Sequence, residues 1–219
     1  VQYHGDRMAR AARRDACGPK VMGEFHVEIN IDDLIKVIRP SAAQDGSHTI
    51  MLPVYNTQVS VKVYPGSNNL TAEQLDAALV ALRDLAIEFE MALSRTRPTS
   101  EVSRLNDAHG QAVALSERTL DLIDKSRAYC EESGGVFDVT MGSVTPLWDF
   151  HIGVVPAREQ LDEALRHVDW RMIEVDRQAG TARLADPEAR IDLGGIAKGY
   201  IADALAAKLL EHGCDCAFV

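Results

Sequence analysis

The segment from Asp192 to Tyr200 places a carboxylate, two adjacent glycines and a lysine between a predicted strand and a predicted helix. Gly194 and Gly195 lack a Cβ, so a ligand could come close to the backbone there. The N–H groups at the helix start and the ammonium of Lys198 would both attract an anion, which suits a phosphate. The glycine spacing fits neither the dinucleotide fingerprint nor the P-loop. A tight strand-to-helix turn without a ligand is therefore an alternative. Asp192 could cap this turn, or it could orient a ligand hydroxyl or a metal-bound water.

A second segment, Ser133 to Thr140, follows a predicted helix end and carries a carboxylate and a hydroxyl. Asp138 in such a loop could bind a sugar, an amide or a metal ion. The alternative is an Asx-type turn after the helix cap. Nearby, Trp148 could stack on a ring, although a lone tryptophan more often belongs to the core.

A third segment, Ser94 to Asn106, is polar and contains several arginines. Guanidinium groups bind phosphate through paired hydrogen bonds, so this loop could meet the same anion. The alternative is a solvated connector in which Ser100 caps a short helix. The histidines have no zinc or haem spacing and no nucleophile elbow occurs, which argues against a hydrolase.

The composition narrows the class of protein. The chain has 219 residues, 46% of them apolar, and a formal net charge of −10, which is typical of a soluble globular domain. The negative charge argues against nucleic-acid binding, because that affinity comes mainly from Lys and Arg neutralising phosphates. No apolar run is long enough to indicate a membrane span, and the first residues lack an apolar signal core.

The elements that would position these segments mix helices with strands. The strongest helix signal starts at Thr71, which forms a capping-box pattern with Gln74 and precedes leucines at helical spacing. Ser116 caps a second helix, which ends at the glycines that follow Ser133. We expect two further helices, from about residue 157 to 167 and from Tyr200 to Glu211, the latter ended by Gly213.

Alternating apolar residues and turn signals predict the strands. These cover residues 25–31, 59–63, 172–175, 181–184 and 191–193, with a last strand beginning at Ala217. Residues 1–22 are basic and poor in large apolar groups, which predicts a mobile arm. Residues 23–48 form a strand-bearing segment with no recognised counterpart, and residues 49–219 form the main domain.

Taken in order, the three polar segments resemble the ApbE family of FAD:protein FMN transferases. Ser94–Asn106 is similar to the family's serine-arginine-proline loop, which ends in S-E-[IV]-S-R-L-N. Ser133–Phe150 resembles its S/T-G-G-x-F-D-x-T-x-G-x-x-x-x-L-W-x-F stretch, and Ile191–Asp203 resembles D-L-G-G-I-A-K-G-Y-x-x-D. Tyr55-Asn56-Thr57 is similar to the M-G-T or M-N-T entry segment. The resemblance covers about residues 50–219 and implies an α+β fold, an ApbE-like mixed α/β domain.

The family's chemistry is implied by this resemblance. Its members split FAD at the pyrophosphate with Mg²⁺, attach FMN through its phosphate to a Thr or Ser hydroxyl of a target flavoprotein, and release AMP. The residues that would line the FAD site are Tyr55, Thr96, Val136, Phe137, Asp138, Asp192 and Lys198. The backbone carbonyl of Gly195 would be a Mg²⁺ ligand. Tyr55 stands where the family often has Met, and Thr96 where it often has Tyr.

The family pattern continues past the position of Val219 with an H-x-x-D-P-x-T-G segment and a later Asp and Thr, which supply further metal ligands. We therefore expect an incomplete copy of a longer enzyme, truncated at its C-terminus and a poor catalyst alone. The alternatives are a flavin- or nucleotide-binding module without transfer activity and an interaction protein that kept only the scaffold. Family members are often exported, but Ala16-Cys17-Gly18 follows no apolar run, so membrane association is not supported and localisation stays open.

Overall fold

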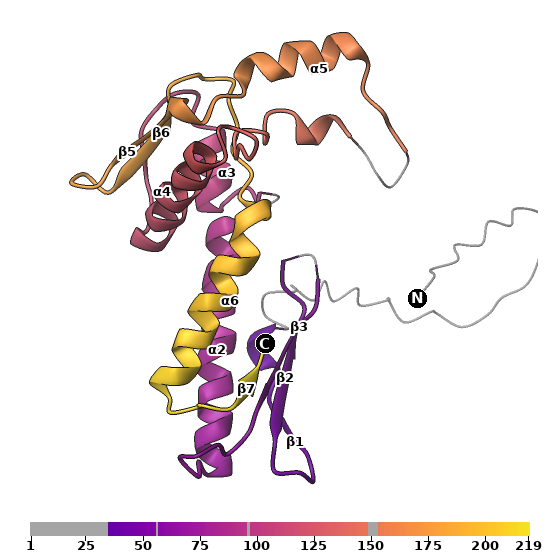
Figure 1. Ribbon diagram of the computed structural model, residues 1–219, viewed down its shortest axis with the longest axis vertical. Helices are drawn as coiled ribbons and strands as arrows, with labels where there is room; N and C mark the ends of the chain where they lie inside the picture. The colour runs from indigo at the N-terminus through magenta and orange to yellow at the C-terminus, as the bar shows by residue number, and fades with distance from the viewer. Residues whose placement is uncertain (1–34, 56, 96, 149–152) are drawn as a thin grey trace, which may run out of the picture.

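Two long antiparallel helices, α2 (Ala72–Leu93) and α6 (Gly194–Glu211), lie side by side along the protein (Figure 1). The computed structural model describes residues 35–55, 57–95, 97–148 and 153–219. The predicted basic arm, the predicted strand over residues 25–31 and Thr96 lie outside the described residues. The helices combine with two antiparallel sheets, which confirms the predicted α+β class.

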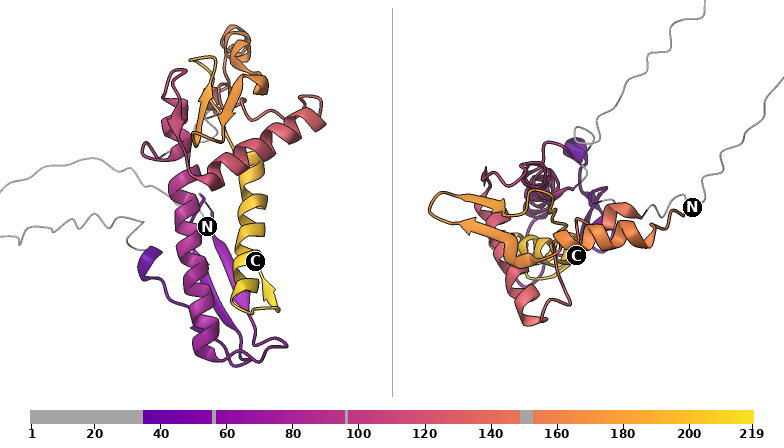
Figure 2. Two further views of the ribbon diagram at one scale, coloured as in Figure 1. Left: turned by 90° about the vertical axis from the view of Figure 1, so that its left-hand side faces the viewer. Right: turned by 90° about the horizontal axis from the view of Figure 1, so that it is seen from above.

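The first sheet lies along the helix pair, toward the start of α2 and the end of α6 (Figures 1 and 2). Its strand order is β1-β2-β3-β7, formed by Ser41–Ala42, His48–Leu52, Val59–Val63 and Ala217–Phe218. Ile50 lies opposite Val61, and both side chains are buried. The sequence predicts β3 and β7 but not β1 or β2.

The second sheet, of order β4-β6-β5, lies at the other end of the molecule. It is formed by β4 (Val113–Ala114), β5 (Ile173–Asp176) and β6 (Thr181–Leu184). The β5–β6 pair confirms the predicted hairpin, with β5 one residue later than expected. Helices α3 (Glu101–Asn106) and α4 (Glu117–Glu132) lie beside this sheet.

The remaining helical segments connect these layers. They are η1 (Thr145–Leu147), α5 (Arg158–Ala164), η2 (Leu165–His167) and η3 (Trp170–Met172). Together, α5 and η2 span the predicted third helix, whose last turn tightens into a 3-10 helix.

Side-chain caps start the helices where the sequence predicts. The Gln74 backbone N–H donates to Thr71 Oγ1 at 3.3 Å, and the Thr71 N–H donates to Gln74 Oε1 at 2.9 Å, which completes the capping box. Ser100 and Ser116 accept in the same way from N–H groups in the first turns of α3 and α4. These bonds satisfy donors that have no partner inside the helix.

The predicted start of the last helix is wrong. The chain becomes helical at Gly194 rather than at Tyr200, so both glycines and Lys198 lie in the first turns of α6. The apolar stripe explains the earlier start, because Ala197 and Ile201 are already buried on the face that continues to Leu209. Burial of that face outweighs the poor helix propensity of glycine.

The predicted strand over residues 191–193 is also wrong, since this segment has no strand conformation. The backbone N–H of Ile191 donates to Asn106 Oδ1 at 2.8 Å, and Asn106 Nδ2 donates to the Ile191 carbonyl at 3.0 Å. The Asp192 N–H donates to the Val139 carbonyl at 2.8 Å. A buried side chain thus takes the backbone groups that a neighbouring strand would need, and it holds the segment just before α6.

Candidate functional site

A cleft of about 540 Å³ lies where the end of α2 meets the start of α6. Its size is within the range of small-molecule sites. Its walls come from segments far apart in the sequence: the turn after β2, the end of α2 with the following loop, and the first turns of α6. The lining residues are Tyr55, Thr57, Glu90, Leu93, Ser94, Arg95, Asp192, Gly194, Ala197, Lys198 and Ile201.

Asp192 connects two of these walls. Its Oδ1 accepts from the Gly194 backbone N–H at 2.8 Å, and its Oδ2 lies 3.4 Å from Arg95 Nε. The turn-capping interpretation is therefore confirmed for one carboxylate oxygen. The other oxygen faces the arginine loop across the cleft, where a ligand could exchange for the ion pair.

Lys198 of α6 lines the cleft, and its side chain is exposed. It forms no ion pair with any residue in the described part of the chain. Arg95 and Lys198 therefore bring two cationic groups to the start of α6. The helix dipole adds to them there, because its positive end attracts anions.

Tyr55 lies at the opposite wall in an unusual backbone conformation, with φ of +58°. Its hydroxyl donates to the Ala86 carbonyl of α2 at 2.7 Å. Burial, and next the negative charge of Glu90, raise the pKa of the Tyr55 phenol, so it stays a neutral donor at physiological pH. The hydroxyl is thus engaged by the fold, and the ring is what Tyr55 offers to the cleft.

Glu90 lies under the cleft between two loops. Its Oε2 accepts from the Tyr55 N–H at 2.8 Å, and its Oε1 accepts from Arg97 Nε at 3.2 Å. Only 14% of its side chain is exposed. The sequence gives no local signal for this residue, because its partners are brought to it only by the fold.

Three predicted site residues, Tyr55, Asp192 and Lys198, meet in the cleft. Phe137 and Gly195 instead lie together in a second hollow of about 590 Å³, which Ile196 and Gly199 of α6 also line. A Cβ built on Gly195 would come within 3.1 Å of Phe137 Cε2, so the glycine allows the ring to pack closely. These five predicted residues are therefore divided between two hollows that flank the first turns of α6.

Asp138 is not among the described residues that line either hollow. Its Oδ1 accepts from the backbone N–H and the hydroxyl of Thr140, at 2.8 and 2.6 Å, and its Oδ2 accepts from the Trp170 N–H at 3.1 Å. The Asx-turn interpretation is thus confirmed. Val136 points into solvent with 92% of its surface exposed. Ligand binding by Val136 and Asp138 stays a prediction.

The described residues do not form a metal site by themselves. No group of three or more His, Cys, Asp and Glu side chains in this part of the chain could hold an ion. The cleft carboxylates, Glu90 and Asp192, both have protein partners. The predicted Mg²⁺ ligand, the Gly195 carbonyl, lies in the first turn of α6. Within the described residues, no helix is long and apolar enough to cross a membrane.

The sequence indicates Arg95 only as part of an arginine-bearing loop, and Thr57 only as part of the entry segment. Leu93 and Glu90 lie on α2, where helical spacing predicts a core-facing stripe and says nothing of a cleft. The contacts that gather these residues are long-range. Only the antiparallel placement of α2 and α6 brings them together.

Curated relatives match most of the chain. An FAD:protein FMN transferase of Treponema pallidum is 34% identical over 176 residues, which is 76% of this chain and 47% of the relative. An FAD:protein FMN transferase of Chlamydia muridarum is 25% identical over 187 residues, 84% of this chain and 58% of the relative. The chain thus spans about half the length of these relatives.

Solved structures match the fold as well. The flavin transferase ApbE of Vibrio cholerae aligns with a TM-score of 0.67 and 25% identity, over 78% of this chain and 56% of that one. The ApbE protein of Thermotoga maritima aligns with a TM-score of 0.62 and 26% identity, over 80% and 52%. The family's sequence profile matches residues 55–219. This chain therefore belongs to the ApbE family, as the order of its polar segments predicts.

Proposed function

We propose that this chain contributes the FAD-binding cleft of an FAD:protein FMN transferase. The reaction splits FAD at its pyrophosphate and joins FMN, through its phosphate, to a Thr or Ser hydroxyl of a target flavoprotein. The acceptor oxygen bonds to the FMN phosphorus, the bond from that phosphorus to the bridging oxygen breaks, and AMP leaves with that oxygen. The hydroxyl proton passes to solvent or to a base.

The observation that carries this proposal is the convergence of Arg95, Lys198 and the start of α6 on one cleft in a member of the ApbE family. A pyrophosphate needs N–H donors and cations around its oxygens. The two side chains supply positive charge and N–H donors, and the positive end of the α6 dipole adds to that charge. When the ligand binds, Arg95 would exchange the Asp192 oxygen 3.4 Å away for a phosphate oxygen.

The other cleft residues suit the rest of the dinucleotide. Leu93, Ala197 and Ile201 give apolar surface on which a ring could lie. The Asp192 oxygen released by Arg95 could accept from a ribose hydroxyl or an exocyclic amine. Phe137 offers a second aromatic surface on the far side of the first turn of α6. Two ring surfaces beside a cationic centre match a molecule with two ring systems joined by a pyrophosphate.

The proposal includes a requirement for Mg²⁺, and the described residues do not by themselves form a site for that ion. Mg²⁺ prefers six oxygen ligands in octahedral geometry. The predicted ligand in this chain remains the Gly195 carbonyl. The assay below tests the requirement directly with a chelator.

The test is AMP release measured by chromatography, with the chain, FAD, Mg²⁺ and a flavoprotein acceptor. The Treponema pallidum relative serves as positive control, and an acceptor whose target Thr is changed to Ala serves as negative control. Release that disappears with EDTA and with the altered acceptor supports the full proposal. FAD binding without AMP release would restrict the chain to binding. If the chain neither bound FAD nor released AMP, the proposal would be refuted.

A further inference from the structure

We infer that Glu90 is the positioning residue of the cleft, and that it holds the two loops on either side of the α2 end in their ligand-ready arrangement. The inference rests on the proposed function, because the cleft matters only if it binds FAD. It assigns a role to a residue that lines the cleft and whose two carboxylate oxygens both accept hydrogen bonds from the protein.

The contacts of Glu90 join two segments that are far apart in the sequence. Tyr55 follows β2, and its N–H donates to Oε2 at 2.8 Å. Arg97 belongs to the loop after α2, and its Nε donates to Oε1 at 3.2 Å. Tyr55 and the nearby Arg95 both line the cleft. One carboxylate therefore sets the positions of two cleft walls relative to α2.

The backbone of Tyr55 shows why such a tie is needed. A φ of +58° is unfavourable for a residue with a side chain, and it persists only where the surroundings impose it. Two bonds to α2 do so here, from the Tyr55 N–H to Glu90 and from its hydroxyl to the Ala86 carbonyl at 2.7 Å. Loss of the first bond would let the turn relax toward an ordinary conformation.

A site whose walls are fixed before binding avoids the cost of ordering them with the ligand. Glu90 would therefore increase FAD affinity without forming a hydrogen bond with the ligand. A matched residue lies two positions earlier on the same helix. Glu88 is 64% exposed, pairs with Arg118, and lines a different hollow. A glutamate of α2 without a role in the cleft is thus available as a control.

The experiment compares Glu90→Gln, Glu90→Leu and Glu88→Gln in the full chain. The first readout is NMR-detected hydrogen exchange of the Tyr55 backbone amide and the Arg97 Nε–H without ligand, because these are the two groups that donate to Glu90. A Gln side chain can still accept from the Tyr55 N–H, but its amide group opposes Arg97 Nε. Glu90→Gln should therefore speed exchange of the Arg97 Nε–H while the Tyr55 amide stays protected. Glu90→Leu should expose both N–H groups, with the Tyr55 amide exchanging at least about tenfold faster.

The second readout is the FAD dissociation constant, measured by flavin fluorescence. We expect an increase of about threefold for Glu90→Gln and about tenfold for Glu90→Leu, with no change for Glu88→Gln. A loss of stability alone would not change the FAD affinity of the molecules that remain folded. Matching circular dichroism spectra would show that the variants are folded under the conditions of the titration. If Glu90→Leu does not fold, the Gln variant still tests the Arg97 half of the tie.

Unchanged exchange at both the Tyr55 amide and the Arg97 Nε–H in the Glu90 variants would overturn the inference, as would an equal loss of affinity in Glu88→Gln. The exchange readout needs no ligand, so it separates this inference from the proposed function. If wild-type chain fails to bind FAD, the proposed function falls, while the exchange rates still report whether Glu90 ties the two loops.

Discussion

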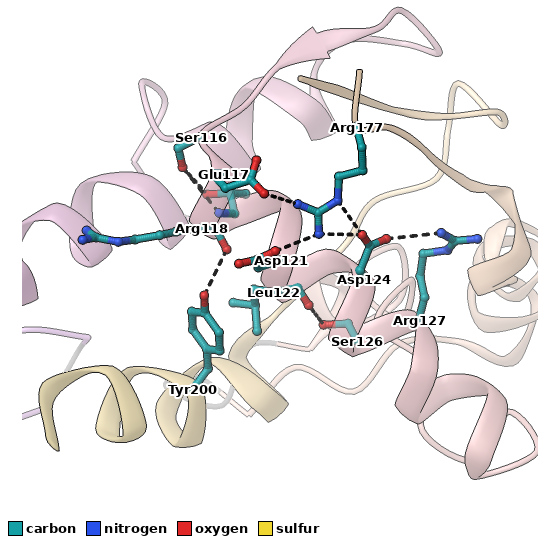
Figure 3. A network of polar contacts seen from close by, with 11 residues as sticks. Ser116, Glu117, Arg118, Asp121, Leu122, Asp124, Ser126, Arg127, Arg177 and Tyr200 are labelled. Atoms are coloured by element: carbon teal, nitrogen blue, oxygen red, sulfur yellow. Dashed lines mark hydrogen bonds and ion pairs between the residues drawn. The ribbon is translucent and has the colours of Figure 1, made fainter. Parts of the chain in front are cut away.

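Two groups of charged side chains differ in how many of their cationic nitrogens have a carboxylate partner. In the first, Arg177 in the turn between β5 and β6 reaches the acidic face of α4 (Figure 3). Its Nη1 donates to Glu117 at 2.7 Å, its Nη2 to Asp121 at 2.8 Å and its Nε to Asp124 at 2.8 Å. Every nitrogen of the guanidinium has a carboxylate partner.

In the cleft, by contrast, Arg95 has one ion pair of 3.4 Å with Asp192, and Lys198 has none with the described residues. The difference separates two uses of charge. The Arg177 group ties a hairpin to a helix and has no capacity left for a ligand. The cleft group is incompletely paired and lies at a helix start, so it can bind an anion.

Helix α4, whose carboxylates bind Arg177, also contacts α6. Helix α4 contacts α6 through Tyr200, whose hydroxyl lies 3.5 Å from the Arg118 carbonyl (Figure 3). Tyr200 packs edge-to-face against Phe89 of α2, with ring centroids 5.9 Å apart. The satisfied group thus belongs to the scaffold that holds α6, and the unsatisfied group belongs to the site at the start of α6.

The largest expected effect comes from a polar contact of the scaffold, the buried Asn106. Asn106→Ala would leave the N–H and the carbonyl of Ile191 without their present partners. We expect the free energy of unfolding to fall by about 3 kcal/mol, because two buried backbone groups lose their hydrogen bonds. Urea denaturation measures this. A loss below about 1 kcal/mol would mean that other groups or water replace the amide.

The next effect concerns the cleft. Lys198→Ala should raise the FAD dissociation constant about tenfold or more, because a charge-assisted phosphate contact is lost. Lys208→Ala is the matched control, since Lys208 lies on the same helix and pairs with Glu211 at 3.0 Å. Riboflavin, which has no phosphate, should bind both variants equally. Equal weakening by both substitutions would refute the role of Lys198.

A smaller effect is expected at Arg177. Arg177→Gln should lower the free energy of unfolding modestly, because exposed ion pairs are screened by water and salt. It should leave the FAD dissociation constant unchanged. Thermal denaturation at low and high salt, together with flavin fluorescence, checks both statements. Loss of FAD affinity comparable to that of Lys198→Ala would remove the distinction between the two groups.

The smallest effect is a pH dependence at the turn between β1 and β2. Hydrogen bonds from the Ser47 hydroxyl and N–H, followed by a bond from Lys62, lower the pKa of Asp45 to about 2. A lowered folded pKa stabilises the fold above the unfolded value of about 3.9 and loses this effect as the pH falls toward 2. Carboxyl NMR titration should give a midpoint near the lower value. A midpoint near the unfolded value would show that the turn does not perturb Asp45.

Local signals in the sequence predict the helix starts well. Thr71, Ser100 and Ser116 cap their helices as expected, because capping depends on residues within one turn. The start of α6 is not predictable in this way. Its glycines favour a turn locally, and only burial of Ala197 and Ile201 against the rest of the protein makes the segment helical.

The site is predictable in part. Asp192 and Lys198 are close in sequence, so a motif can find both. Glu90 and Arg95 enter through the antiparallel placement of α2 and α6, which no local pattern encodes. Asp138 shows that a motif does not fix the role of a residue. Its carboxylate is part of a recognisable motif, yet its contacts with Thr140 and Trp170 stabilise the local structure.

An NMR titration of the labelled chain with FAD tests most sharply whether the cleft is the FAD site. If it is, the largest amide shifts should occur at Tyr55, Arg95, Gly194 and Lys198. Amides near Arg177 and Asp124 should stay unchanged. Shifts concentrated around Arg177, or none in the cleft at saturating FAD, would contradict the proposal that the incompletely paired cations of the cleft bind the ligand.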